Sequence, residues 1–394
     1  MSNSSSVHLK RPFFFENWQA SAEQGASDFV EGCEFPLYSD AWMTGEERVG
    51  PYHFINTIAH ASGHTGIAPV MVIRAGFHVE ISEPKMDRTD TSLYHGGALS
   101  DEVAALAALA IGARVKAGPT TRQFSTGDSR GRPVAYWGHQ PPVLPRGDGR
   151  IRLPRVQGSR FLGDLQWLGD WVDRDPRDEI ALIRSARLYQ EALWIGDAEP
   201  ALAWLLLVSA VETVADRWYS FKVSRVDRLR DAKPRVVQML EENCPSILAN
   251  IADELADSVG STRKFVEFIR HFLPPAPTIR PPEAFQVEWE HVAFAKMLRT
   301  IYAYRSKALH TGVPFPAPMC DARIDLSGTR GICERPVGLA MSTMGAVWLQ
   351  KDTPMLLHIF AYLTREVLKA WWSALKPRSG DETRDVGISG NEGK

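Results

Sequence analysis

The chain has 394 residues, of which 44% are hydrophobic and 23% charged. This composition predicts a folded protein with room for more than one core and excludes disorder except at the ends. A formal net charge of -2 excludes a protein that coats nucleic acid nonspecifically, because such binding draws on a large positive field. Any contact with RNA must therefore be local.

Cysteine usage and hydropathy bear on location. The four cysteines have neither disulfide-like nor zinc-like spacing, which is typical of a reducing compartment. The longest apolar run, at residues 201–211, is too short to span a bilayer, and the first 15 residues lack the apolar segment of an export signal. We therefore expect a cytoplasmic protein with no membrane contact.

Residues 1–145 form the first predicted domain, whose role the sequence does not indicate. Short apolar runs are separated by Gly, Pro and aromatic residues, and the run at residues 68–81 predicts one or two strands. One helix interrupts the pattern, with Ser100 as a favourable N-cap and Gly118 followed by Pro119 as its stop. The pattern predicts a mixed α/β or β-rich domain.

Residues 146–177 are expected to form a basic linker rich in Pro and Gly. Arg146, Arg150 and Arg152 at its start face one nearby acid, Asp148. Such a cluster could follow a phosphate backbone. A solvated connector between two domains is the more common use of this composition.

From residue 178 the pattern becomes helical, and residues 178–377 predict an all-α bundle. Asp197 is placed to cap one helix, and the prolines at residues 274–282 must break the chain before a long one. The expected helices cover residues 180–193, 198–219, 222–243, 245–259, 261–272, 284–309 and 353–375. The polar tail at residues 378–394 is expected to be disordered. The whole chain is thus predicted to be α+β.

Basic side chains gather on the helix expected at residues 222–243. Six Lys and Arg residues between positions 222 and 235, among them Arg225 and Arg228, oppose only Asp227 and Asp231. Because a charge run on a helix is usually a solvated face, an RNA-binding surface that includes Arg225 and Arg228 is the second interpretation.

Residues 304–312, with the sequence YRSKALHTG, place an arginine and a histidine near the end of a helix. Arg305 keeps its charge at any working pH and matches phosphate oxygens, while His310 can give or take a proton near neutrality. Five positions leave the two side chains roughly 140° apart on an ideal helix, so they converge only if the helix loosens or a second copy supplies the partner. From spacing alone, an ion pair for Arg305 and a capping role for His310 are the simpler interpretation.

Residues 301–312 resemble the signature of the HEPN superfamily, most closely its Apea-like group, in which an arginine and a polar residue precede a histidine. Residues 201–213, apolar with the single acid Glu212, resemble an earlier core helix of that group. The resemblance covers residues 178 to 375, and Ser306 departs from the Asn, Asp or His that is more common after the arginine in nuclease members. It implies a helical bundle that pairs so that both motifs face one cleft.

The resemblance implies a metal-independent endoribonuclease, such as a toxin or an antiphage defence effector. His310 would act as general acid or base on the ribose 2′-hydroxyl, and Arg305 would stabilise the charge that develops on phosphorus. Glu212, on a facing helix, would orient one of them. Neither a metal nor a cofactor is required for this chemistry.

Further residues would support RNA binding at the same place. Ser306 and Lys307 would contact phosphates, and Tyr304 could stack on a base, although its apolar neighbours favour core packing equally. The alternative function is a noncatalytic module that binds RNA, a nucleotide or a protein through the same cleft. The expected partners are RNA, a second copy through the helical domain, and an antitoxin or regulatory protein.

Overall fold

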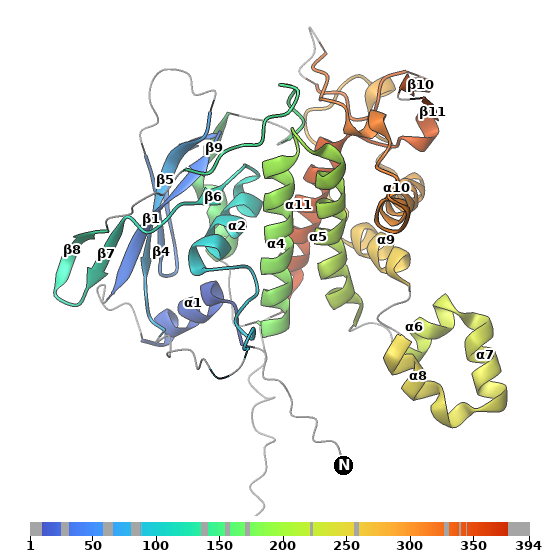
Figure 1. Cartoon of the computed structure of the whole chain (residues 1–394), viewed down its shortest axis with the longest axis horizontal. Coiled ribbons are helices and arrows are strands. Elements are labelled where there is room, and N and C mark those ends of the chain that lie inside the picture. Colours follow the sequence, from blue (N-terminus) through green and yellow to red (C-terminus); the bar gives the residue numbers. More distant parts are fainter. Residues whose placement is uncertain are drawn as a thin grey trace, which may run out of the picture.

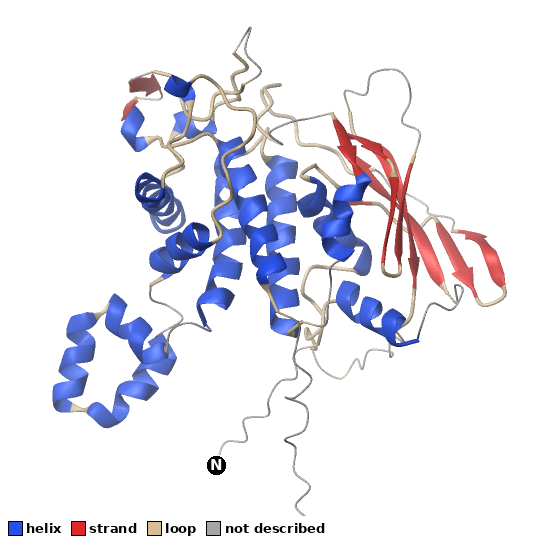
Figure 2. Ribbon diagram, turned by 180° about the vertical axis from the view of Figure 1, so that it is seen from behind, coloured by secondary structure: helices blue, strands red, loops and turns tan. Residues whose placement is uncertain are grey.

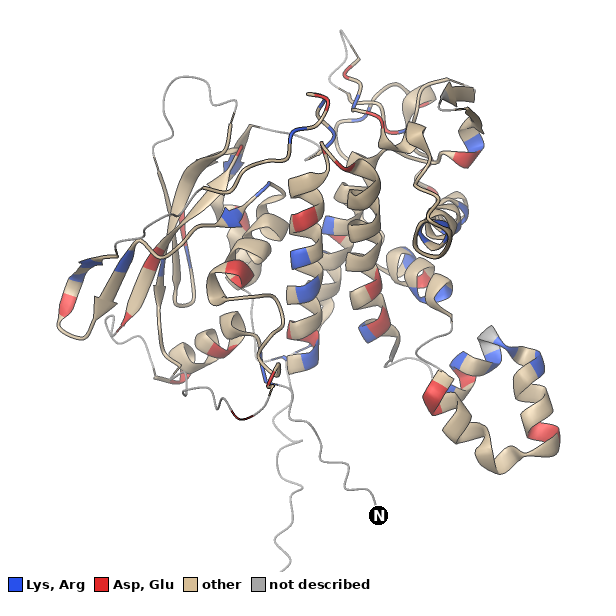
Figure 3. Ribbon diagram, viewed as in Figure 1, with Lys and Arg blue, Asp and Glu red and all other residues tan. Residues whose placement is uncertain are grey.

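The computed structural model separates the chain into a β-sheet and a layer of helices (Figure 1), which the reverse view shows equally well (Figure 2). Charged residues of both signs are spread over both parts (Figure 3). Among the described residues, no helix is long and apolar enough to cross a membrane. The described residues are 10–24, 31–57, 66–79, 87, 89–134, 141–153, 158–169, 174–220, 224–255, 260–326, 331–338, 340–343 and 345–376.

The main sheet is antiparallel and comes from the first third of the chain. Its strands lie in the order β3-β4-β5-β1-β7-β8, and the short β6 also pairs with β1. Two smaller pairs are β2 with β9, which is parallel, and β10 with β11. The strands are β1 (Gly32–Ser39), β2 (Trp42–Thr44), β3 (Glu46–Val49), β4 (Tyr52–Asn56), β5 (Ala68–Gly76), β6 (Lys116–Ala117), β7 (Arg122–Ser125), β8 (Asp128–Pro133), β9 (Ser159–Phe161), β10 (Ala340–Thr343) and β11 (Ala346–Leu349).

Alternating side chains make one face of this sheet apolar. Phe35 of β1 lies opposite Ile73 of β5, which lies opposite Phe54 of β4, and all three are buried. Successive residues of a strand point to opposite faces, so these three share one. The helices α1 (Phe13–Gln24) and α2 (Leu99–Ile111) share a hydrophobic core with the sheet. The strand β5 confirms the prediction of a strand within residues 68–81.

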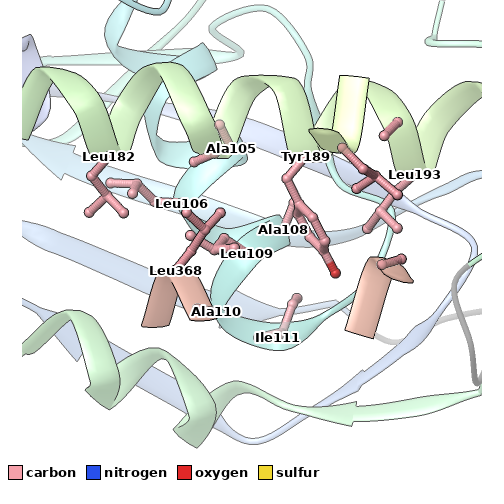
Figure 4. Packing of buried hydrophobic residues seen from close by; sticks show 14 of the residues in the cluster. Ala105, Leu106, Ala108, Leu109, Ala110, Ile111, Leu182, Tyr189, Leu193 and Leu368 are labelled. Carbon is pink, nitrogen blue, oxygen red and sulfur yellow. The ribbon is translucent and has the colours of Figure 1, made fainter. Parts of the chain in front are cut away.

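Helix α2 lies at the centre of the molecule. Its residues 102–111 are all buried, and its many alanines let it fit between the sheet and two long helices, α4 (Pro176–Ile195) and α11 (Leu357–Ala374) (Figure 4). The prediction that Ser100 caps this helix is wrong: the N-cap is Ala98, whose N–H donates to Asp101 Oδ2 at 3.1 Å. The helix ends at Gly112 in the left-handed region, with φ 64°, which suits glycine.

One charged residue, Glu102, lies inside this apolar helix with 0% of its surface exposed. Its Oε2 accepts a hydrogen bond from the backbone N–H of Phe14 at 2.8 Å, which holds the start of α1 against α2. Its Oε1 has no partner among the described residues. Burial disfavours the charged form and raises the pKa of Glu102 to about 8.

The second half of the chain supplies the helical layer, and the expected α+β class is confirmed. Trp204 lies at its centre, stacked on Phe315 at 5.3 Å and on Phe360 at 4.8 Å between ring centroids. The long helix expected from residue 284 begins only after Glu290, because residues 283–285 form a separate short turn. Besides α4 and α11, the layer contains α5 (Pro200–Ser220), α9 (Ser261–His271) and α10 (His291–Thr311), with the short α3 (Gln166–Gly169) at its edge.

Three short helices stand apart from this layer (Figure 1). They are α6 (Arg225–Ala232), α7 (Pro234–Asn243) and α8 (Leu248–Leu255), and they share a small core of Leu229, Val237 and Ala252. The prediction of a single helix over residues 222–243 is therefore wrong, because Pro234 cannot continue α6 and begins α7 instead.

A charged network ties the sheet to the helices. Buried Arg114 pairs with Asp40 and with Asp197, each at 2.5 Å, and donates from Nε to the carbonyl of Leu193 at 2.7 Å. Asp197 does not cap α5 as expected, because the helix begins at Pro200 and Asp197 lies two residues before the N-cap position. Its other oxygen accepts the backbone N–H of Arg152 at 2.5 Å. Arg152 belongs to the segment expected as a linker, yet it is only 9% exposed. One hydrophobic cluster contains residues of both the sheet and the helical layer.

Candidate nucleic-acid site on α10

Helix α10 carries both residues of the motif and is regular over its whole length. Glu290 caps its start by accepting two backbone N–H groups, and Gly312, with φ 70°, ends it after Thr311. The helix does not loosen before His310. Arg305 and His310 therefore stay on faces roughly 140° apart within one chain.

Arg305 is on the inner face and binds Glu212 of α5. Its Nη2 lies 2.6 Å from Glu212 Oε2, while the hydroxyl of Tyr302 donates to Oε1 at 2.5 Å. Burial, and then the hydrogen bond to Glu212, raise the pKa of Tyr302 to about 12, so this hydroxyl keeps its proton near neutral pH. Both oxygens of Glu212 are thus occupied, and the guanidinium is held in one position.

A pocket of about 340 Å³ opens beside this ion pair, between α5, α9 and α10. A second pair lies in its wall, Lys264 of α9 with Asp216 of α5, at 2.5 Å. The two pairs balance formally, so the pocket has no net charge. It is lined by Ser209, Glu212, Thr213, Ala215, Asp216, Ser261, Lys264, Phe265 and Arg305.

Not all N–H donors of Arg305 are used among the described residues. Its Nε is buried and has no hydrogen-bond partner among the described residues, and only Nη2 binds Glu212. A buried N–H without a partner costs free energy unless water or a ligand oxygen fills the place. Arg305 is 20% exposed, so an oxygen atom in the pocket can reach its guanidinium.

His310 is outside this pocket, exposed in the last turn of α10. Within the part of the chain that the structure describes, its ring makes no hydrogen bond and no ion pair, so the expected bonds to the last carbonyls are not formed. Leu309, one turn after Arg305, and Val313 are apolar neighbours that are each 52% exposed. An apolar, exposed helix end of this kind can be covered by another molecule.

The remaining residues of the motif segment are divided between surface and packing. Ser306 is half-buried, and Lys307 is exposed with its Nζ 5.9 Å from the centre of the Tyr304 ring. The Tyr304 hydroxyl donates to the carbonyl of Asp352 at 2.7 Å, and its ring packs beside Phe315. Tyr304 is thus fixed in the fold and is not free to stack on a base.

In the basic segment after α5, the arginines of α6 make contacts within the fold. Arg228 is 7% exposed and lies over the ring of Tyr219 at 5.8 Å, so it does not face RNA. Arg225 donates to the carbonyl of Asp253 at 2.8 Å, and its neighbour Arg230 pairs with acids on α6 and α7. These arginines hold the three short helices together, while Lys233 and Arg235 stay exposed and have no ion pair among the described residues.

Sequence reasoning did not find Lys264 and Asp216, and it did not assign Tyr302 its bond to Glu212. Lys264 could have been found from its position in α9 beside Phe265 and other apolar residues. A lysine that is buried there needs an acidic partner. Tyr302 precedes Arg305 by one helical turn and so meets the same acid.

Comparison of the chain with protein-family models, with curated proteins and with solved structures finds no match.

Proposed function

We propose that this protein is a metal-independent endoribonuclease of HEPN type whose active centre takes Arg305 from one chain and His310 from a second. The observation that carries the proposal is the regularity of α10, which fixes Arg305 in a pocket and leaves His310 exposed on another face. Exposed Leu309 and Val313 beside them provide an apolar surface for the second copy. The pairing is thus a homodimer through the helical layer.

The reaction follows from the two side chains. Neutral His310 takes the proton of a ribose 2′-hydroxyl, whose oxygen attacks the adjacent phosphorus. Arg305 donates its unused N–H groups to the phosphate oxygens, where charge increases as the bond to the 5′-oxygen breaks. That oxygen takes a proton from water as it leaves, giving a 2′,3′-cyclic phosphate and a 5′-hydroxyl, and His310 then releases to solvent the proton that it took. Ser306 and Lys307 contact neighbouring phosphates.

The test is complementation between two inactive variants, Arg305→Ala and His310→Ala, on mixed cellular RNA in EDTA. Each variant alone should be inactive. Random pairing makes about half of the dimers mixed, and each mixed dimer has one intact centre of two, so the mixture should recover about a quarter of wild-type activity. Mixing Arg305→Ala with the double variant is the matched control and should recover nothing, because no arginine is present.

Two results would contradict the proposal in different ways. No cleavage by folded wild type would remove the ribonuclease assignment. Wild-type cleavage without recovery in the mixture would place both groups in one chain and remove the two-chain centre. A toxin or antiphage role, with an antitoxin or regulatory partner, belongs to the same proposal and depends on the first result.

The second candidate is a noncatalytic module that binds RNA, a nucleotide or a protein at the same pocket. The observation in its favour is that Arg305 is already paired with Glu212 and that Lys264 is paired with Asp216. RNA that is bound by wild type, left uncut at every protein concentration and released by Arg305→Ala would support it.

A further inference from the structure

The outer face of α10 carries a row of cations. Lys296, Arg299 and Lys307 are exposed, and exposed His310 follows at the end of the same face. From His291 to Thr311 the helix contains no Asp or Glu. At 100° per residue these four side chains lie within about 80° of one another around the axis, so they form one stripe. We call Lys296, Arg299 and Lys307 the α10 stripe.

The stripe lacks the acidic partners that neutralise other basic residues here. Among the described residues, the side chains of Lys296 and Arg299 make no ion pair or hydrogen bond, and Lys307 contacts only the Tyr304 ring. Arg225 and Arg230 of α6, by contrast, bind nearby carboxylates. Figure 3 shows basic but no acidic residues on α10. Three unpaired cations on one face attract a polyanion locally, although the whole chain has a net charge of -2.

The shape of the stripe favours a single strand. From Lys296 to His310 it extends about 21 Å along a straight helix, at 1.5 Å per residue. Double-stranded RNA hides its major groove from side chains and offers a wide, shallow minor groove, whereas a single strand can lie along a helix with its phosphates toward the cations. Two copies of the stripe would repel each other, since like charges would meet.

We propose that the α10 stripe binds the backbone of single-stranded RNA and leads it to His310. The inference rests on the proposed ribonuclease function for the identity of the strand, and it names the surface that selects the substrate. Lys296 is the entry of this track, and Lys307, one turn before His310, is the residue of the stripe nearest the scissile phosphate.

The experiment measures binding apart from cleavage. The probe is a fluorescein-labelled 20-nucleotide single strand with 2′-O-methyl riboses, which lack the nucleophile, titrated by anisotropy in EDTA between 50 and 200 mM salt. Each phosphate contact contributes roughly -0.7 to the slope of log affinity against log salt, so the three cations together contribute about -2. The triple change of Lys296, Arg299 and Lys307 to Gln should bind at least tenfold more weakly at about 50 mM salt and lose about 2 from this slope.

A matched control makes the same change of charge on the sheet: Arg48, Arg130 and Arg132, all exposed, are changed to Gln. It should bind like wild type, and both triple variants should keep the wild-type melting temperature. An unchanged slope in the α10 variant, or equal affinity of wild type for duplex DNA of the same length, would overturn the inference. If wild type binds the probe tightly, binding depends on the α10 stripe, and ordinary RNA is not cleaved, the ribonuclease function is contradicted and the RNA-binding role of the stripe is supported.

Discussion

The buried carboxyl of Glu102 makes the stability of this protein depend on pH in an unusual direction. An ordinary acid helps the folded state as it ionises, but Glu102 has 0% exposure and a pKa raised by burial to about 8. Its Oε2 still accepts the N–H of Phe14, a bond that the neutral acid can keep through its carbonyl oxygen. Ionisation therefore costs free energy in the folded state only.

The size of the effect follows from the two pKa values. Between pH 4.5 and about 8 the folded state binds the proton and the unfolded state does not, so the free energy of unfolding falls as pH rises. Each pH unit within this window removes about 1.4 kcal/mol, and the total loss is roughly 4–5 kcal/mol. Above about pH 8 the contribution is constant. Buried His95, whose pKa is lowered by burial, acts in the opposite direction.

The assay is urea unfolding from pH 5.5 to 8.5, followed by tryptophan fluorescence, for wild type and Glu102→Gln. The amide imitates the neutral acid, so the variant should lack the fall and should be the more stable protein at pH 8.5. The difference between the two proteins cancels His95 and every other shared group. Exposed Glu46→Gln is the control and should follow wild type. A difference that does not change with pH would refute the reasoning.

Three further outcomes are expected. Arg114→Met leaves two carboxylates beside a buried site without their counter-ion, and urea unfolding should show a loss of about 3 kcal/mol; a loss below 1 kcal/mol would contradict this account. Trp204→Ala removes a fully buried ring stacked between two others and should cost about 3–5 kcal/mol, measured by calorimetry against Trp42→Ala on the surface. Burial and then Glu212 raise the pKa of Tyr302 to about 12, so Glu212→Gln should lower this pKa in part, with burial still raising it; tyrosinate absorbance in difference against Tyr302→Phe will show whether it does.

Local signals were sufficient for much of the fold. The apolar periods of α4, α5 and α11 predicted these helices because each buries one face, and Gly312 marked the end of α10 because only glycine adopts its backbone angle at little cost. The apolar run of β5 likewise predicted a strand. These are properties of neighbouring residues, which a sequence contains directly.

Contacts between distant residues were not predictable in the same way. Asp197 was expected to cap a helix, but Arg114, 83 positions earlier in the chain, binds its carboxylate. The residues around Arg152 have the composition of a surface linker. Arg152 is nevertheless buried, and it donates hydrogen bonds to the carbonyl of Cys320 and to that of Asp197 in the turn after α4. At the site, the sequence placed Glu212 near the motif. It could not show that Tyr302 shares that acid or that Lys264 lines the same pocket.

The central position of α2 has a consequence for how the protein is made. The carbonyls of Leu109 and Ala110 at its end are bound by Arg365 of α11, and Leu368 of α11 packs on the same helix (Figure 4). Leu109 and Arg365 are 256 positions apart, so at about 5–20 residues per second a ribosome needs roughly 10–50 s to go from one to the other. Throughout that time the apolar helix α2 lacks the part of its cover that α11 provides. Nascent chains should therefore bind chaperones along α2, and chains that stop before α11 should be degraded.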